Sequence, residues 1–201
     1  TGTLTQGTPS VAAVCPLAEG ISQEELYTLA ARAEGRSEHP LGKAVVACFK
    51  ENRKAGNVSA DGKAEPVAEK NQIPQPGTFE MIPGRGVKAR IGDRQVLAGN
   101  LEMMTEQQLT PDRQAAETAQ KYLKEGCTVI YLAVDGALEG ILALADTLRP
   151  EAGEMIGQLS AMHVEPVLLT GDHKNAAEHI ASQLGIHTVH PECLPEDKMK
   201  W

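Results

Sequence analysis

Hydrophobic positions in the first quarter of the chain recur at the spacing of amphipathic helices. Ser22 begins a capping sequence (SQEE), and apolar residues then follow at intervals of three and four, which predicts a helix. A second helix is predicted through Ala44 to Phe49. Before them, residues 1–10 are small and polar and predict a loop, and residues 11–14 predict a short strand. Residues 52–75 are polar and rich in Gly, Pro, Lys and Glu, which predicts a long loop.

Short alternating runs replace the helical pattern between Phe79 and Asn100, and they predict strands joined by tight turns. Asp112 then begins a further helix that ends at Gly126. Residues 129–134 and 138–145 predict two strands around an Asp-Gly pair, the strongest hairpin signal in the chain.

The pattern changes again after Asp146. A helix over residues 151–162, a strand over 164–169, a helix over 175–184 and a short strand near Val189 alternate, which predicts a parallel sheet. The expected fold class is therefore mixed α/β and α+β. An antiparallel-sheet domain, residues 10–138, is inserted into a parallel α/β domain made of residues 1–9 and 139–201.

The composition of the chain excludes several classes of binding partner. The 201 residues include 19 Lys and Arg against 27 Asp and Glu, a net charge of −8. A surface this acidic argues against nucleic acid and against anionic lipid. No run of about 20 apolar residues suits a membrane crossing, and the four widely spaced cysteines suggest neither a zinc site nor a disulfide framework.

Residues 170–172 (TGD) are placed where a buried strand ends and a helix begins, the edge at which α/β folds bind ligands. A Thr170 hydroxyl and free helix N–H groups suit a phosphate, although an ordinary capped turn would have the same sequence. Lys198, near the start of the last predicted helix, could contact a phosphate oxygen or be simply solvated.

A second set of candidates surrounds a proline and several glycines. Pro40 fixes the conformation of His39, so that the imidazole could lie flat against a base, and Glu34 stands close by in the sequence. Taken alone, His39 fits a surface or packing residue better than a ligand. The pair Gly84/Gly86 allows close backbone approach to a ligand, although a plain tight turn is the better reading of the pair taken alone. Gly99 and Asn100 stand at the end of a predicted strand, where such a pair usually forms a turn.

The order of these segments resembles that of heavy-metal-transporting P-type ATPases. Residues 1–5 (TGTLT) resemble the tail of the DKTGTLT signature, and residues 37–41 (SEHPL) resemble an element particular to the heavy-metal branch. The glycine pairs resemble the remaining nucleotide-binding elements of that branch. Residues 146–149 (DTLR), 170–172 (TGD) and 194–198 (LPEDK) resemble motifs of the phosphorylation domain. The match covers the whole chain in the right order.

This resemblance implies an ATP site in the inserted domain and a haloacid-dehalogenase-like phosphorylation domain in the flanks. Adenine would lie near His39, with Glu34 at its edge. The backbone at Gly84 and Gly86 would approach the nucleotide, and Gly99 and Asn100 would complete the pocket.

The resemblance also implies the residues of phosphoryl transfer. Thr170, Asp172 and Lys198 would hold the transferred phosphoryl group, and the carbonyl oxygen of Thr1 would be a ligand of Mg²⁺. The phosphorylated aspartate would stand two residues before Thr1, outside the sequence.

The abrupt ends indicate an excised fragment of a larger pump. We expect this fragment to be soluble and monomeric and to bind ATP, without forming an acyl-phosphate or transporting metal by itself. Its partners would be the remaining domains and membrane helices of the pump, at the cytoplasmic face of a membrane. The wording ADTLR at residues 145–149 favours zinc or cadmium over copper.

Two other functions are compatible with parts of the sequence. A phosphatase of the haloacid-dehalogenase-like superfamily, with residues 10–138 as its cap, would use the same Thr170 turn and Lys198, but it leaves Glu34, His39 and the glycine pairs unexplained. A non-catalytic nucleotide-sensing module would explain the missing aspartate.

Overall fold

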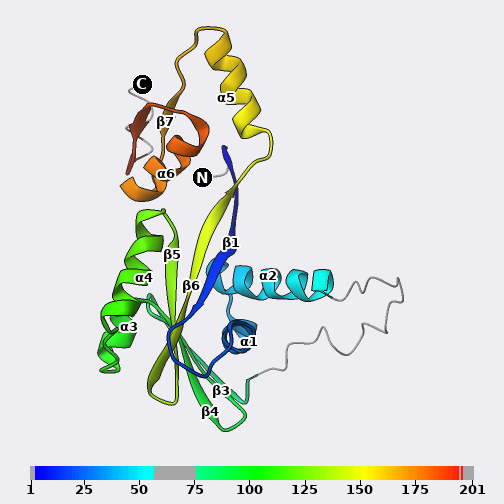
Figure 1. Cartoon of the computed structure of the whole chain (residues 1–201), viewed down its shortest axis with the longest axis vertical. Coiled ribbons are helices and arrows are strands. Elements are labelled where there is room, and N and C mark those ends of the chain that lie inside the picture. Colours follow the sequence, from blue (N-terminus) through cyan, green and yellow to red (C-terminus); the bar gives the residue numbers. More distant parts are fainter. Residues whose placement is uncertain (1–2, 57–75, 195, 197–201) are drawn as a thin grey trace.

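An antiparallel sheet forms the body of the larger part of the molecule (Figure 1). The computed structural model describes residues 3–56, 76–194 and 196. The sheet is six-stranded, in the order β1-β6-β5-β4-β3-β2, and every neighbouring pair is antiparallel. Its strands are β1 (Thr5–Pro16), β2 (Thr78–Ile82), β3 (Gly86–Ile91), β4 (Arg94–Gly99), β5 (Thr128–Val134) and β6 (Ala137–Leu148).

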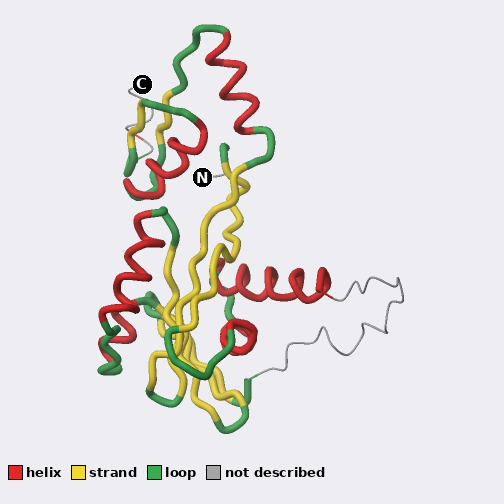
Figure 2. The backbone as a smooth tube through the Cα atoms, viewed as in Figure 1, coloured by secondary structure: helices red, strands yellow, loops and turns green. Residues whose placement is uncertain are grey.

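Helices cover both faces of this sheet (Figures 1 and 2). One face carries α1 (Gln23–Ala33) and α2 (Pro40–Gly56), which the short 3₁₀ helix η1 (Glu34–Arg36) connects. The other carries α3 (Leu101–Glu106) and α4 (Arg113–Lys124).

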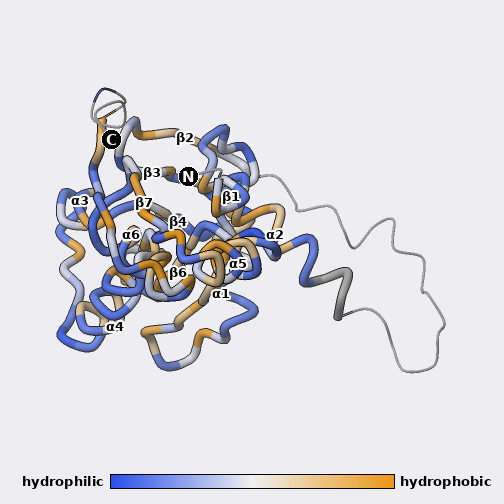
Figure 3. The backbone as a smooth tube through the Cα atoms, turned by 90° about the horizontal axis from the view of Figure 1, so that it is seen from above, coloured by the Kyte–Doolittle hydropathy of each residue, from blue (hydrophilic) through white to orange (hydrophobic). Residues whose placement is uncertain are grey.

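Strand β5 contributes alternate residues to two hydrophobic cores. Ile130 and Leu132 pack with α1 and α2, whereas Tyr131 and Ala133 pack with α3 and α4. This alternation follows from the two-residue period of a strand and explains why β5 is apolar almost throughout. Seen from above, strands β4 and β6 are largely hydrophobic, whereas the peripheral α4 is largely hydrophilic (Figure 3).

A smaller unit stands beyond the ends of β1 and β6 (Figure 1). It consists of α5 (Ala152–Ala161), β7 (Val167–Leu169), α6 (Lys174–Leu184) and β8 (Thr188–His190), and its two strands pair in parallel. Residues from both ends of the described chain meet here, because Arg149 N donates to Leu4 O at 2.9 Å and Leu4 packs against the core of this unit.

Local signals in the sequence placed several elements correctly. Ser22 caps α1 by accepting the N–H of Glu25 at 3.1 Å, the Asp135–Gly136 pair joins β5 to β6, and β7 and β8 are parallel. The mixed fold class, with an antiparallel sheet and a parallel α/β unit, is confirmed.

Two predicted loops were wrong in part. Strand β1 begins at Thr5 rather than at Val11, since its polar first half pairs with β6, as in the register Ser10↔Ala145. Helix α2 continues to Gly56, so the predicted loop does not begin at residue 52. The rest of that loop, residues 57–75, lies outside the described residues.

The predicted domain division stays a prediction. Its boundary between residues 138 and 139 falls inside β6, which runs without interruption from the sheet toward the smaller unit. Of the helices that the structure describes, none combines the length and the hydropathy that a bilayer crossing requires.

Candidate functional site

A cavity of about 310 Å³ opens where β3 begins and β4 ends. We call it the sheet-end cavity. Its walls come from η1, the start of α2, the turn between β2 and β3, the end of β4 and the start of β5. All residues that the sequence predicted for the nucleotide line it: Glu34, His39, Gly84, Gly86, Gly99 and Asn100.

Glu34 is a buried carboxyl in the wall of this cavity. It is 6% exposed and belongs to the turn that connects α1 to α2. Burial raises the pKa of Glu34 to about 7, and a hydrogen bond with the Ser37 side chain acts in the opposite direction. Near neutral pH this carboxyl can therefore either accept or donate a hydrogen bond.

Gly42 provides the room that Glu34 occupies. A Cβ atom at this position would collide with Glu34 Oε2 and would stand 2.6 Å from Ser37 Oγ. The close approach of α2 to η1 thus depends on the missing side chain, and it fixes where the carboxyl can lie.

His39 is exposed, but its loop and its ring are both held by hydrogen bonds. Its backbone N–H donates to Ser37 Oγ at 3.3 Å, and its ring Nδ1 accepts the N–H of Leu41 at 3.2 Å. In a neutral ring the proton is therefore on Nε2. A fixed, accessible imidazole of this kind can stack on a planar ligand.

The glycines bring backbone directly to the cavity. Gly86 pairs with Gly99 across the β3–β4 ladder, and its φ of 152° lies in the region that favours glycine. A Cβ atom on Gly86 would collide with the Ala98 carbonyl oxygen, and one on Gly99 would stand 2.5 Å from the carbonyl oxygen of Arg85. These two positions therefore admit no larger residue without a shift of backbone.

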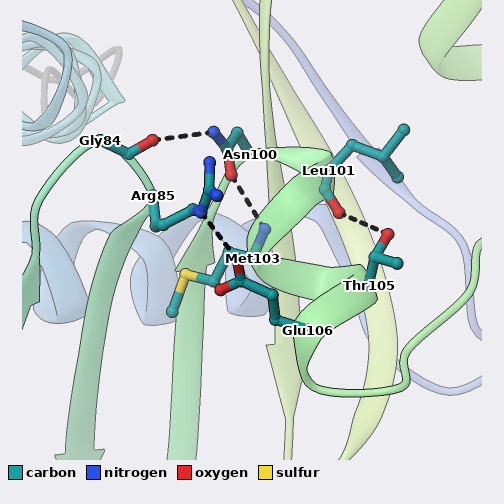
Figure 4. Close-up of polar contacts among 7 residues, drawn as sticks. All are labelled: Gly84, Arg85, Asn100, Leu101, Met103, Thr105 and Glu106. Atoms are coloured by element: carbon teal, nitrogen blue, oxygen red, sulfur yellow. Dashed lines mark hydrogen bonds and ion pairs between the residues drawn. The ribbon is translucent and has the colours of Figure 1, made fainter.

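The side chain of Asn100 connects the turn at Gly84 with the start of α3. Its Nδ2 donates to Gly84 O at 3.0 Å, and its Oδ1 accepts the N–H of Met103 at 3.0 Å, which caps α3 (Figure 4). The turn before β3 is thereby tied to the first turn of α3.

The predicted phosphoryl-binding residues lie in the smaller unit. Thr170, 2% exposed, directly follows β7, and its hydroxyl donates to Asp172 Oδ2 at 2.6 Å. The backbone of Cys193 closes on this turn, because Cys193 N donates to Thr170 O at 2.8 Å. Thr1 and Lys198 lie outside the described residues.

A larger cavity of about 700 Å³ lies between the sheet and the smaller unit, and Gly171 and Asp172 are in its lining. We call it the inter-unit cavity. It shares Leu41 and Thr128 with the sheet-end cavity, so the two are neighbours. Thr170 lines a separate cavity of about 490 Å³, together with Asp172.

Sequence reasoning missed Ser37, Gly42 and Arg85 as parts of this site. All three line the sheet-end cavity. Ser37 and Gly42 stand within or next to the SEHPL segment, and Arg85 is flanked by the Gly84/Gly86 pair. Proximity to those motifs was the available signal, but the role of each residue depends on contacts that the sequence does not display.

Comparison with known proteins shows the family of this chain. The model of one family, described as haloacid dehalogenase-like hydrolase, matches residues 1–200. The chain belongs to the haloacid dehalogenase-like hydrolases. The curated relatives of this chain include a copper-exporting P-type ATPase of Staphylococcus aureus (strain bovine RF122 / ET3-1). It is 34% identical over 198 residues, which is 98% of this chain and 22% of the relative.

Two solved structures also resemble this chain. A zinc-transporting PIB-type ATPase in the E2.Pi state is 36% identical, with a TM-score of 0.80 over 100% of this chain and 29% of that chain. The catalytic domain of the CPx-ATPase CopB-B shares the fold, with a TM-score of 0.62 at 23% identity over 100% of this chain and 61% of that one.

These findings confirm the resemblance to heavy-metal P-type ATPases on which the sequence analysis relied. The chain spans about a fifth of the length of the curated relatives it matches.

Proposed function

We propose that this chain binds ATP in the sheet-end cavity and directs its phosphates toward residues 170–172. It would do so as the ATP-binding part of an ATP-driven heavy-metal pump, for transfer of the γ-phosphoryl group to an aspartate that residues 1–201 do not include. The observation that carries the proposal is that the six residues predicted for the nucleotide, which come from separate segments of the chain, all line one cavity. That cavity is at the lower end of the size range of small-molecule sites, roughly 300 to 1,000 Å³.

The chemistry of the cavity suits an adenine ring. The imidazole of His39 offers a flat surface, and the glycines in the lining of the same cavity present backbone without side chains. Glu34, when ionised, would accept a hydrogen bond from the exocyclic amine of adenine. Guanine presents a carbonyl oxygen at the same position, which an ionised carboxyl repels.

The neighbouring cavity gives the phosphate chain a direction. Leu41 and Thr128 line both cavities, so phosphates that leave the adenine region past these residues would enter the inter-unit cavity, where Asp172 lies. Phosphoryl transfer depends mainly on such positioning and on charge neutralisation.

The inter-unit cavity also suits Mg²⁺. Asp146, in its lining, has a buried Oδ1 atom without a hydrogen-bond partner among the described residues. Mg²⁺ is commonly held by one or two carboxylates together with substrate phosphates, and there it would neutralise phosphate charge. The carbonyl oxygen of Thr1 remains the predicted ligand.

The transported ion and the membrane location belong to the whole pump. The relatives include one pump named for copper and one named for zinc. The preference for zinc or cadmium therefore stays a prediction, as does a position at the cytoplasmic face of a membrane.

Calorimetric titration with ATP and with GTP, both in excess Mg²⁺ and at a pH above the raised pKa of Glu34, tests the proposal. We expect saturable ATP binding with a Kd in the micromolar to millimolar range, about −4 to −8 kcal/mol, and weaker GTP binding. Equal affinity for both nucleotides would contradict the assignment of Glu34. The absence of ATP binding at millimolar concentration, in a folded sample, would overturn the proposed function.

A further inference from the structure

Four carboxyl groups of the described residues line the two cavities. Glu34 lines the sheet-end cavity, and Glu125, Asp146 and Asp172 line the inter-unit cavity. Arg85 is the only lysine or arginine among the described residues that line either one. A nucleotide phosphate chain carries several negative charges. Among the described residues that line the cavities, Arg85 is the one side chain with a permanent positive charge to balance them, and the other basic groups are the imidazoles of His39, His173 and His179.

Arg85 is held at the rim of the sheet-end cavity by Glu106 of α3. Its Nε donates to Glu106 Oε1 at 3.0 Å, and its side chain is 38% exposed (Figure 4). This contact uses Nε only. The two terminal nitrogens of a guanidinium carry further N–H donors, and their planar fork matches the oxygens of a phosphate.

The strand register places Arg85 on the side of the cavity from which the phosphates would leave. Gly86 begins β3 and pairs with Gly99 at the end of β4, and Gly99 pairs with Tyr131 of β5. Thr128, at the start of β5, lies at this same end of the sheet and is shared with the inter-unit cavity. The turn that carries Arg85 therefore emerges at the end of the sheet that adjoins the inter-unit cavity.

We propose that Arg85 binds the phosphate chain of the nucleotide through its terminal nitrogens, while Glu106 holds its Nε side. Arg85 would then be a specificity-determining residue that favours nucleoside di- and triphosphates over nucleosides. This inference rests on the proposed function, because it concerns the same cavity and the same ligand.

Arg85→Gln tests this role, and Arg94→Gln is its matched control. Arg94 begins β4, its side chain is 41% exposed, and it pairs with Glu25 at 2.9 Å and with Asp135 at 3.7 Å, but it does not line the cavity. Each variant removes one charge together with exposed ion pairs, one for Arg85 and two for Arg94. The probes are ATP and adenosine in constant excess Mg²⁺, followed through the backbone amide signals of each protein, whose spectrum also reports folding.

For Arg85→Gln we expect ATP affinity to fall by about five- to twentyfold, as for the loss of a charged hydrogen bond at a partly exposed site, with adenosine affinity within about twofold of wild type. Arg94→Gln should bind both probes as wild type does. Arg85→Lys, which keeps the charge and loses the fork, should fall between wild type and Arg85→Gln.

Other results would overturn the inference. If Arg85→Gln binds ATP like Arg94→Gln, or loses ATP and adenosine affinity equally, Arg85 does not bind phosphate, although the proposed ATP site stands. If the folded wild type binds neither probe, the proposed function fails, and the inference fails with it.

Discussion

The carboxamide of Asn100 lies 3.0 Å from the carbonyl oxygen of Gly84, to which its Nδ2 donates. The other end of the same carboxamide caps α3 through Met103 N. One side chain therefore fixes the turn before β3 against the helix that follows β4. This contact helps to set the position of the Gly84–Gly86 turn relative to Gly99 in the sheet-end cavity.

Replacing Asn100 by Asp separates the two functions of this side chain. Aspartate still caps α3, but it cannot donate to Gly84 O and it sets a negative charge against that carbonyl oxygen. We expect Asn100→Asp to weaken ATP binding while most of the capping energy is kept. Asn100→Ala should lose the cap as well, at about 1 kcal/mol.

Urea unfolding and ATP titration of both Asn100 variants separate these effects. If Asn100→Asp binds ATP as tightly as wild type, the bond to Gly84 has no part in shaping the cavity.

Gly42→Ala should distort the Glu34 wall of the cavity. Alanine in a helix normally gains about 0.5 to 1 kcal/mol over glycine. At this position, however, the new Cβ would collide with Glu34 Oε2 and crowd Ser37 Oγ. Overpacking of this kind costs roughly 1 to 3 kcal/mol, so we expect a net loss of stability and weaker ATP binding.

Gly157→Ala in α5 is the control for Gly42→Ala, because a Cβ atom there would meet nothing within 4 Å. It should gain the full helical preference and leave ATP binding unchanged. Similar unfolding midpoints and ATP affinities for the two variants would show that Glu34 does not need the space beside Gly42.

Glu34 should make stability depend on pH. Its pKa in the folded protein is raised from 4.5 to about 7, so the folded state holds the proton more tightly than the unfolded chain does. This contribution is complete below the unfolded pKa and is lost as the pH rises through the folded one.

Glu34→Gln removes this titration. Between about pH 4.5 and pH 7, the wild type should therefore lose about 3 kcal/mol of stability relative to Glu34→Gln. Urea unfolding of both proteins below, within and above this window measures the difference. A constant difference across the window would mean that the folded protein does not hold a proton on Glu34.

Local chemistry is the part of this molecule that the sequence displays. The Ser22 cap, the hairpin turn at Asp135 and the Thr170 turn each depend on a few adjacent residues, and the structure has all three. The start of β1 was missed because Thr5 to Ser10 are polar and become a strand only through pairing with β6, more than a hundred residues later.

The candidate site divides in the same way. The SEHPL segment and the glycine pairs were visible as motifs, but their convergence on one cavity depends on the strand order and on the Gly86↔Gly99 register. The sequence analysis expected Asn100 to lie in a plain turn and missed that it caps α3. This helix spans only 6 residues, which is too short to give a clear helical pattern in the sequence. The space at Gly42 depends on how α2 packs against η1, which no spacing along the chain reveals.

Backbone amide NMR during an ATP titration tests the central claim most directly. We predict saturable shifts at the residues that line the sheet-end cavity, and a weaker response to the same ATP concentrations in His39→Ala. The residues to follow are Glu34, His39, Gly84, Gly86, Gly99 and Asn100. A folded sample whose amides at these positions do not move at millimolar ATP would contradict the account.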